Sequence, residues 1–489
     1  MSTGQPRPDR VPVAIVGGGF SGAAVAWHLL RLRPGLERVV IIEPRAELGR
    51  GLAYSAADPS HRINVPATRM SLLPDQPTHF NDWLEASGAL EADPAARRSE
   101  GRNFPARAVF GTYVAEQLAA LGPRVQHIAA AAEAVEAHGH GYRIRTSDGA
   151  TLEAGIVVLA VAHAPPSPPT ALARALAGHP RFLPDPWKAG ALEALRPDDR
   201  VLIVGTGLTM ADLVATLDRR GHRGAIVAVS RRGLRSRGHP AAQHDPYGDF
   251  ATDPARTAGA LVKRIRAAVA EAVAEGKSWH CVLDQVRLQG STIWNALPLS
   301  ERARLLRHLR PFWDVHRFRI APQVEEVLDQ KIAAGTLRLR AASLRGVERQ
   351  GDAKGDAIVV SFRDRRTGTV TRETFDAVLT ATGPAHGRVF ADNPVLAALE
   401  RAGLARPDKL RLGIEVTADG RAIGCDGVPT QDLYVAGPLA RGTVGELMGL
   451  PDVTNYAIRI AAAVATRLEP DAVSDDAPTL YASARSARK

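Results

Sequence analysis

Two glycine-rich segments have the residue types and spacing of a nucleotide phosphate site. The first, Gly-Gly-Gly-Phe-Ser-Gly, begins at Gly17 and fits the pattern G-x-G-x-x-G. In this pattern the first glycine allows a tight turn, the second lets the backbone approach a pyrophosphate, and the third lets helix and strand pack closely. We therefore predict a dinucleotide site that includes Gly17, Gly19, Phe20, Ser21 and Gly22.

The residue that ends the next apolar run indicates which dinucleotide this turn binds. Glu43 follows the run Val39 to Ile42 and lies 26 positions after Gly17 (43 minus 17). A carboxylate at this place accepts hydrogen bonds from ribose hydroxyls and would repel a 2′-phosphate. The first turn is therefore predicted to bind FAD.

A second copy of the turn begins at Gly205, with Met210 in place of the third glycine. The same offset of 26 (231 minus 205) leads here to Arg231 instead of an acid. A hydroxyl and two guanidiniums beside it can bind a 2′-phosphate, which favours NADPH over NADH, although a solvated basic turn is the alternative. The residues predicted to bind NADPH are Gly205, Thr206, Gly207, Ser230, Arg231 and Arg232.

The elements around each turn form the same βαβ order. Strands are expected at 11–16 and 39–42 around a helix at 23–32, and at 201–204 and 225–229 around a helix at 208–220. Each unit is followed later by a hairpin region and a buried strand, at 142–162 and 358–383. The predicted fold class is α/β, with two Rossmann-type dinucleotide-binding domains and a mainly helical insertion at about 254–334.

Domain boundaries are predicted from linkers and from these repeats. The run Ala-Pro-Pro-Ser-Pro-Pro at 164–169 cannot form helix and separates a first FAD-binding part, 1–165, from an NADPH-binding domain, 166–335. A second FAD-binding part is assigned to 336–470, and 471–489 to a mobile tail.

Composition limits the function classes. The chain has 489 residues, a net charge of +10 and only two cysteines, Cys281 and Cys425, which are far apart and form no C-x-x-C pair. A redox-active disulfide and a zinc site are therefore not predicted, and no metal ligands are assigned. The arginines are spread along the chain, so we predict neither a nucleic-acid nor a membrane partner, and a cytoplasmic protein of undetermined oligomeric state.

Several segments resemble those of a known family, the bacterial FAD/NAD(P)-binding proteins similar to urate hydroxylases, which are related to the class B flavoprotein monooxygenases. The resemblance covers about residues 11–467. It rests on GGGFSG, GLAYS at 51–55, NVPATRMSLLPDQPTHFNDWL at 64–84, VLIVGTGLTMAD at 201–212, SRRGL at 230–234, WDVHRFR at 313–319, ATGPAHG at 381–387 and LYVAGPLARG at 433–442.

The resemblance implies FAD on the first and last parts of the chain and NADPH on the middle part. It adds Asn64, Arg107, Gly383 and Gly437 to the predicted FAD site, although packing roles for Asn64 and Arg107 are alternatives. One departure is that Gly437 is followed by a proline where many FAD enzymes have an aspartate that binds the ribityl chain.

Catalytic residues are not defined by the sequence. Asp314, His316 and Arg317 are candidates because a histidine can transfer protons and an arginine can bind an anionic substrate, but surface and ion-pair roles fit them equally well. The predicted activity is an FAD-dependent, NADPH-consuming monooxygenase that uses O₂ and a small-molecule substrate. By resemblance the substrate is urate or a related purine. The alternatives are N-hydroxylation of an amine or amino acid, a flavoprotein reductase, and a flavin redox sensor without turnover.

Overall fold

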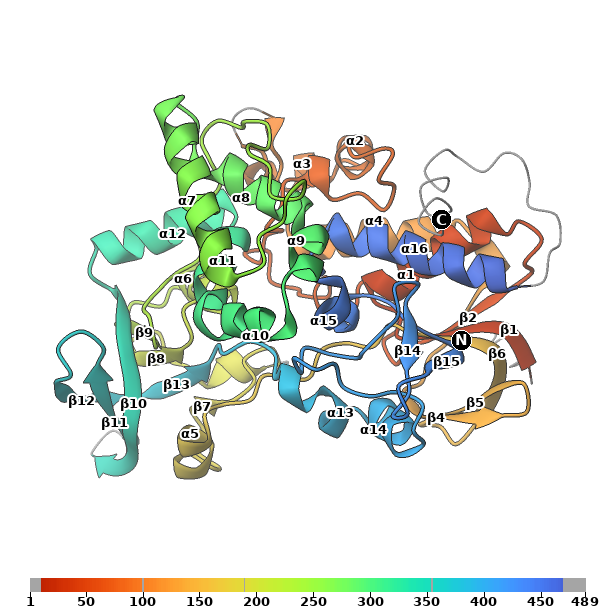
Figure 1. The fold of residues 1–489 in the computed structure, drawn as a ribbon. Helices are drawn as coiled ribbons and strands as arrows, with labels where there is room; N and C mark the ends of the chain where they lie inside the picture. Colours follow the sequence, from red (N-terminus) through yellow and green to blue (C-terminus); the bar gives the residue numbers. More distant parts are fainter. Residues whose placement is uncertain (1–9, 99–100, 189, 353–354, 469–489) are drawn as a thin grey trace.

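The apolar runs before the two glycine turns are central strands of two separate sheets. The structure is a computed structural model that describes residues 10–98, 101–188, 190–352 and 355–468. Figure 1 shows the two sheets at opposite ends of the molecule, with a group of helices on one side of the junction between them. The predicted α/β class with two dinucleotide-binding folds is confirmed, and the predicted tail at 471–489 lies outside the described residues.

The first sheet has the strand order β14-β15-β6-β1-β2-β3, and β4 and β5 extend it as an antiparallel meander on β6. Strands β15, β6, β1, β2 and β3 run parallel to one another. The bounds are β1 Arg10–Val16, β2 Val39–Ile42, β3 Val125–Ile128, β4 Ala132–His138, β5 Gly141–Thr146, β6 Thr151–Leu159, β14 Arg421–Ile423 and β15 Pro429–Val435.

The second sheet has the order β12-β11-β10-β9-β8-β13-β7, parallel from β10 to β7 and antiparallel in the hairpin β10-β11-β12. The bounds are β7 Phe182–Leu183, β8 Val201–Val204, β9 Ile226–Ser230, β10 Leu337–Asp352, β11 Gly355–Asp364, β12 Val370–Phe375 and β13 Ala377–Thr380.

The predicted boundary at residue 336 is wrong. Strand β10 pairs with β9 and β13 pairs with β8, so residues 337–380 complete the second sheet and do not return to the first. The chain crosses to the first domain only after Gly383. Pro384 forms an isolated β-bridge with Pro166, so the two connections between the domains lie side by side.

Helices cover the faces of the first sheet and the side of the second sheet that faces the first domain. Helix α1 (Phe20–Leu32) is almost fully buried because α16 (Asp452–Arg467) packs along it, as Figure 1 shows. In the second domain, α6 (Leu208–Arg219) packs against α12 (Pro322–Ala333). The other helices of the two domains are α2 His79–Ala86, α3 Ala89–Ala92, α4 Arg107–Ala119, α5 Thr170–Ala175, α13 Val389–Asp392, α14 Pro394–Arg401 and α15 Arg441–Val444.

Alternation along β8 shows how one core is shared between the two domains. Val201 and Ile203 belong to the large core that also contains β1, β6 and α1, whereas Leu202 and Val204 belong to a smaller core on the opposite face. Successive strand residues point to opposite faces, so each face of this sheet is covered by apolar side chains.

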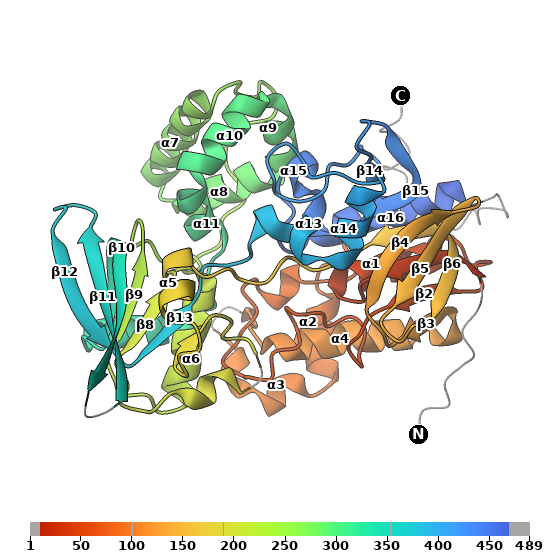
Figure 2. The same ribbon diagram turned by 90° about the horizontal axis from the view of Figure 1, so that it is seen from below.

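The predicted helical insertion is present as a cluster of short helices with its own core. Its helices are α7 Ala258–Ala274, α8 Trp279–Leu288, α9 Gly290–Ala296, α10 Leu299–His308 and α11 Arg310–Arg317. Phe250, Cys281 and Val282 are among its buried residues. Figure 2 shows this cluster standing beside both domains, not as a layer on the second sheet.

In the described part of the chain, no helix is both long and apolar enough to cross a bilayer. The same residues contain no group of three or more histidine, cysteine, aspartate or glutamate side chains that is arranged to hold a metal ion.

The second sheet leads to a stability prediction at Gly205. A β-carbon there would lie 2.0 Å from the Ala381 carbonyl oxygen, and the residue has φ +126°. We expect Gly205→Ala to lower the free energy of unfolding by about 2 kcal/mol or more, because the backbone must move at a strained position. At Gly207 a β-carbon would meet nothing within 4 Å, so Gly207→Ala is the matched control. Urea unfolding measures both, and equal losses would contradict the prediction.

Candidate nucleotide sites

The first glycine turn is held by contacts that leave no room for side chains. Gly17 has φ +104°, and a β-carbon on it would lie 2.4 Å from the Ala160 carbonyl oxygen at the end of β6. A β-carbon on Gly22 would lie 2.0 Å from the Gly17 carbonyl oxygen. The backbone of the turn therefore packs directly against the end of β6, and helix α1 begins within the turn at Phe20.

Glu43 lies beside this turn, as the sequence predicts. Its carboxylate is 4% exposed, and one oxygen accepts a hydrogen bond from the Gly18 N–H at 2.9 Å. The other oxygen accepts from the Arg45 N–H at 3.1 Å and forms an ion pair with the Arg45 guanidinium at 3.0 Å. The acid is thus fixed at the carboxyl end of β2, on the adenosine side of a dinucleotide bound in the usual Rossmann orientation.

Gly437 closes the other side of the turn. It follows β15 with φ +81°, and a β-carbon on it would lie 2.4 Å from the Ser21 hydroxyl oxygen. Gly19 faces Gly51 across the turn, with 3.4 Å between a Gly19 β-carbon and the Gly51 Cα. The N-terminus of α1 and the buried Glu43 fit the pyrophosphate and ribose of FAD.

The second turn repeats this geometry. Gly205 donates a hydrogen bond to the Val229 carbonyl at 2.8 Å, as Gly17 does to Ile42 at 2.9 Å. Ala381 at the end of β13 has the place that Ala160 has in the first domain. Met210 is fully buried where the first turn has Gly22, so this helix accommodates a side chain at the third position.

The three residues predicted to bind a 2′-phosphate have different partners in the structure. The Ser230 hydroxyl accepts hydrogen bonds from the Thr206 hydroxyl at 2.8 Å and the Gly233 N–H at 2.9 Å, which ties the two loops together. Arg232 turns to the insertion, where its guanidinium lies 4.7 Å from the centre of the Phe312 ring and donates to the His308 carbonyl. Arg231 is exposed at the end of β9.

Sequence reasoning missed one cation near this strand end. Arg365, from the turn between β11 and β12, donates to the Arg231 carbonyl at 3.3 Å. No local pattern connects the two residues, because they meet only when β10 pairs with β9.

Two residues predicted for the FAD site have other roles in the structure. Arg107 forms an ion pair with Asp212 of α6 at 2.9 Å and donates to the Arg62 carbonyl, so it fastens the two domains together. Gly383 follows β13 at the carboxyl edge of the second sheet, so it belongs to the NADPH-binding fold. Their assignment to FAD stays a prediction, and the domain interface and strand pairing account for the contacts that they make in the structure.

Asn64 lies at the junction of the domains. Its carbonyl accepts a hydrogen bond from His239 at 3.0 Å. His239 is a second-domain residue whose pKa falls to about 3, chiefly because it is buried and secondarily because of Arg319. His239 is therefore neutral, and the segment around Asn64 is anchored to the second domain.

The catalytic candidates of helix α11 do not converge. Asp314 pairs with Arg310 at 3.3 Å, and burial raises its pKa. The His316 ring packs edge-on against Trp279, with 4.9 Å between ring centres, and its Nδ1–H donates a hydrogen bond to the Phe312 carbonyl of its own helix at 2.7 Å. Arg317 points to a third place, where it forms an ion pair with Glu446 at 3.1 Å.

Arg317 belongs to a group of buried ion pairs that fasten the insertion to the loop before α16. Arg287 forms an ion pair with Asp452, the first residue of α16, at 2.7 Å, and Trp294 donates to the Gly442 carbonyl at 3.0 Å. Burial lowers the pKa of Arg317 to about 10, which still leaves it charged at neutral pH. The ion pairs of Arg287 and Arg317 with Asp452 and Glu446 were not predicted, since a charged residue gives no sequence signal of a distant partner.

Comparison with known proteins agrees with this geometry. Residues 14–164 match the model of the family described as FAD-NAD(P)-binding, a segment that includes the first glycine turn and Glu43. No curated protein sequence matches the chain.

Solved structures show the same overall fold at low sequence identity. L-lysine 6-monooxygenase from Pseudomonas syringae has a TM-score of 0.62 at 16% identity, and ornithine hydroxylase from Pseudomonas aeruginosa has 0.60 at 16%. An ornithine N-hydroxylase from Kutzneria sp. 744, described with reduced FAD, NADP⁺ and L-ornithine, has 0.60 at 17%. Each alignment covers 94% of this chain and 100% of the other.

The interface around Arg107 leads to a second prediction. Asp212 is only 4% exposed, so Arg107→Leu leaves a buried carboxylate without its cation. We expect the free energy of unfolding to fall by about 3 kcal/mol, with a partial recovery when Asp212→Asn is added.

The matched control is Arg219→Leu, which removes the more exposed Arg219–Asp58 pair of the same interface. This pair should contribute less than about 1 kcal/mol. Denaturant unfolding distinguishes the two variants, and a loss at Arg107→Leu no larger than the control's would refute the buried role.

Proposed function

We propose that the protein is an FAD-dependent, NADPH-consuming monooxygenase of a small molecule, and that its reaction is N-hydroxylation of an amine or amino acid. The observation behind the proposal is the pair of glycine turns, Gly17 and Gly205, each at the carboxyl edge of a parallel sheet. An acid, Glu43, follows the first, and a base, Arg231, follows the second. The lysine and ornithine hydroxylases of the same fold support the amine as substrate.

Flavin, when bound, supplies hydride acceptance from NADPH and activation of O₂. The balanced reaction is R–NH₂ + O₂ + NADPH + H⁺ → R–NHOH + NADP⁺ + H₂O. The protein's contribution is to orient the two nucleotides. We assign Gly17, Gly19 and Glu43 to FAD, and Gly205, Gly207 and Arg231 to NADPH. The buried Arg107–Asp212 ion pair joins the two domains that carry these sites.

A disulfide reductase is disfavoured by the cysteines. A thioredoxin reductase from T. acidophilum shares the fold, with a TM-score of 0.50 at 13% identity. Here Cys281 is buried in the core of the insertion, whereas Cys425 is exposed in the first domain, and both are free thiols. Neither is paired for the exchange that such a reductase needs. Urate, suggested by sequence resemblance, has no support from the structural neighbours.

The proposal is tested by product analysis with the purified, flavin-loaded protein. NADPH and O₂ consumption are measured with L-ornithine, L-lysine, acidic amines and urate, and products are examined by mass spectrometry. A hydroxylamine with one oxygen atom from ¹⁸O₂ is the expected result. Oxygen in a purine product would support urate instead. NADPH oxidation with an artificial acceptor and no oxygenated product would indicate a reductase, and negligible oxidation a sensor.

The choice of NADPH over NADH is tested at Arg231. We expect Arg231→Glu to raise KM for NADPH about tenfold or more and to leave KM for NADH nearly unchanged, since only NADPH presents a 2′-phosphate. Arg220→Glu, at the exposed end of α6, changes the net charge equally and is the control. Equal effects of Arg231→Glu on both nucleotides would remove the 2′-phosphate assignment.

A further inference from the structure

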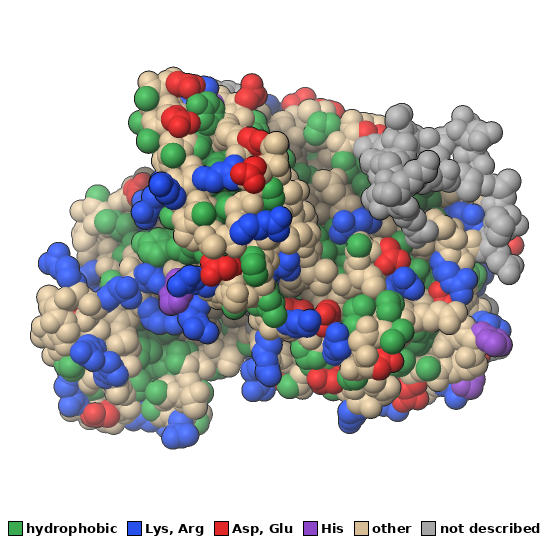
Figure 3. Space-filling view, viewed as in Figure 1, with side chains coloured by type: hydrophobic (Ala, Val, Ile, Leu, Met, Phe, Trp, Pro, Cys, Tyr) green, Lys and Arg blue, Asp and Glu red, His purple; other side chains and the backbone are tan. Residues whose placement is uncertain are grey.

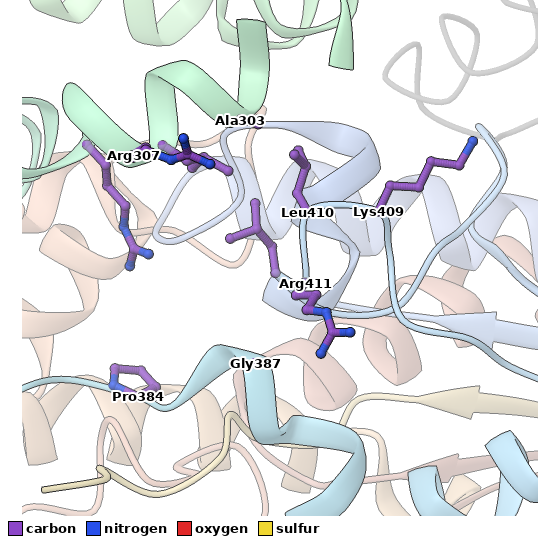
Figure 4. Close-up of a pocket in the computed structure, with 10 residues that line it drawn as sticks. Ala303, Arg307, Pro384, Gly387, Lys409, Leu410 and Arg411 are labelled. Atoms are coloured by element: carbon purple, nitrogen blue, oxygen red, sulfur yellow. The ribbon is translucent and has the colours of Figure 1, made fainter. Parts of the chain in front are cut away.

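A cleft of about 580 Å³ lies between the insertion, the segment that joins β13 to α13, and a loop of the first domain. Its lining includes Arg307 and Arg310 of the insertion, Pro384 and Gly387 after β13, and Lys409 and Arg411 of the loop before β14. Figure 4 shows these segments around an open space. The volume is in the range of small-molecule sites.

The segments that line this cleft are close in sequence to residues that contact the two glycine turns. Pro384 is three residues beyond Ala381, whose carbonyl meets Gly205. On the other side, a β-carbon on Gly413, two residues beyond Arg411, would lie 2.0 Å from the Leu439 carbonyl oxygen. Leu439 in turn follows Gly437, which contacts Ser21. The cleft thus adjoins the segments that follow both turns.

The lining is cationic and has no acid. Among the ten lining residues are three arginines and one lysine, and none is aspartate or glutamate. Only Arg310 has an ion pair in the described structure, with Asp314. In Figure 4 the Arg307 and Arg411 side chains reach into the space between the helix and the Pro384–Gly387 segment, whereas Lys409 points away along the rim. Figure 3 shows Lys and Arg side chains over much of one face of the molecule, so the cleft is distinguished by a lining without acids and not by cations alone.

The loop that presents Arg411 is built around a buried carboxylate. Asp408 is 5% exposed and accepts backbone hydrogen bonds from Leu410 at 2.8 Å, Leu412 at 2.7 Å and Gly413 at 2.5 Å. Within this loop Arg411 has a positive φ of +55°. Among the described non-glycine residues, only Asp432 also has a positive φ. The left-handed conformation costs a residue of this type about 1 kcal/mol, so the hydrogen bonds to Asp408 hold the Arg411 backbone in a strained conformation.

We propose that this cleft is the substrate site and that it binds a small polyanion through Arg307 and Arg411. This inference rests on the proposed function and names its substrate class: an amine whose remote part has two or more acidic groups. Free ornithine or lysine, each with a cationic side chain, would be repelled by the four lining cations. Guanidiniums bind carboxylate and phosphate groups through paired hydrogen bonds, which fixes orientation as well as charge.

The test is a binding titration of the flavin-loaded full-length protein with citrate, without NADPH, followed by calorimetry. We expect citrate to bind and L-ornithine not to bind, with citrate affinity unchanged by saturating NADP⁺. Arg307→Gln and Arg411→Asn should each weaken citrate binding about tenfold or more. Asparagine tolerates the left-handed region, so Arg411→Asn should not lower the thermal unfolding midpoint, and loss of binding cannot then be assigned to unfolding.

The control is Arg304→Gln, one turn before Arg307 on α10, which lies outside the lining and pairs with Glu301. Three results would overturn the proposal: tighter binding of L-ornithine than of citrate, displacement of citrate by NADP⁺, or equal weakening by Arg304→Gln. No citrate binding at millimolar concentration would also overturn it. Since no turnover is involved, an absent hydroxylamine product refutes the proposed reaction and leaves this result standing.

Discussion

In both glycine turns of this protein, peptide backbone meets the end of a strand with no space for a β-carbon: Gly17 against Ala160, and Gly205 against Ala381. Each contact brings the start of a helix directly onto the ends of the parallel strands. The unsatisfied N–H groups of that helix then face the carboxyl edge of the sheet, where an anion gains most from them. Glu43 and Arg231 lie beside the two turns because each follows the second strand of its unit, β2 and β9 respectively.

Buried charge holds the larger parts together. Arg107 reaches Asp212 across the two domains, and Arg287 and Arg317 reach Asp452 and Glu446 between the insertion and the first domain. A buried pair adds little net stability over an apolar contact, but a missing partner is costly, so such pairs select one docking geometry. Part of the arginine-rich composition is therefore used inside the molecule, where the buried arginines are Arg62, Arg287, Arg317, Arg319 and Arg441.

The sequence defined the local units well, since a strand, a glycine turn and a helix are adjacent in the chain. The run Val39 to Ile42 and the acid Glu43 were placed correctly for this reason. The domain boundary was not, because it depends on which distant strands pair, and the contacts of Arg107 and Gly383 depend on the same pairing and on the domain interface. The apolar run of β13 indicates a buried strand. It does not indicate that this strand pairs with β8 instead of β6. The side-chain directions of Asp314, His316 and Arg317 likewise depend on three different partners.

The side-by-side connections at Pro166 and Pro384 mean that the second domain is nested within the first. During synthesis, α1 and β6 emerge early, whereas α16 and β15, which cover and extend them, lie close to the C-terminal end of the described residues and emerge late. The apolar surface of α1 therefore stays uncovered while the whole nested domain is translated. Contacts between segments so distant in sequence form slowly. We therefore expect the incomplete first domain to be prone to aggregation during synthesis and to be a suitable client for chaperones.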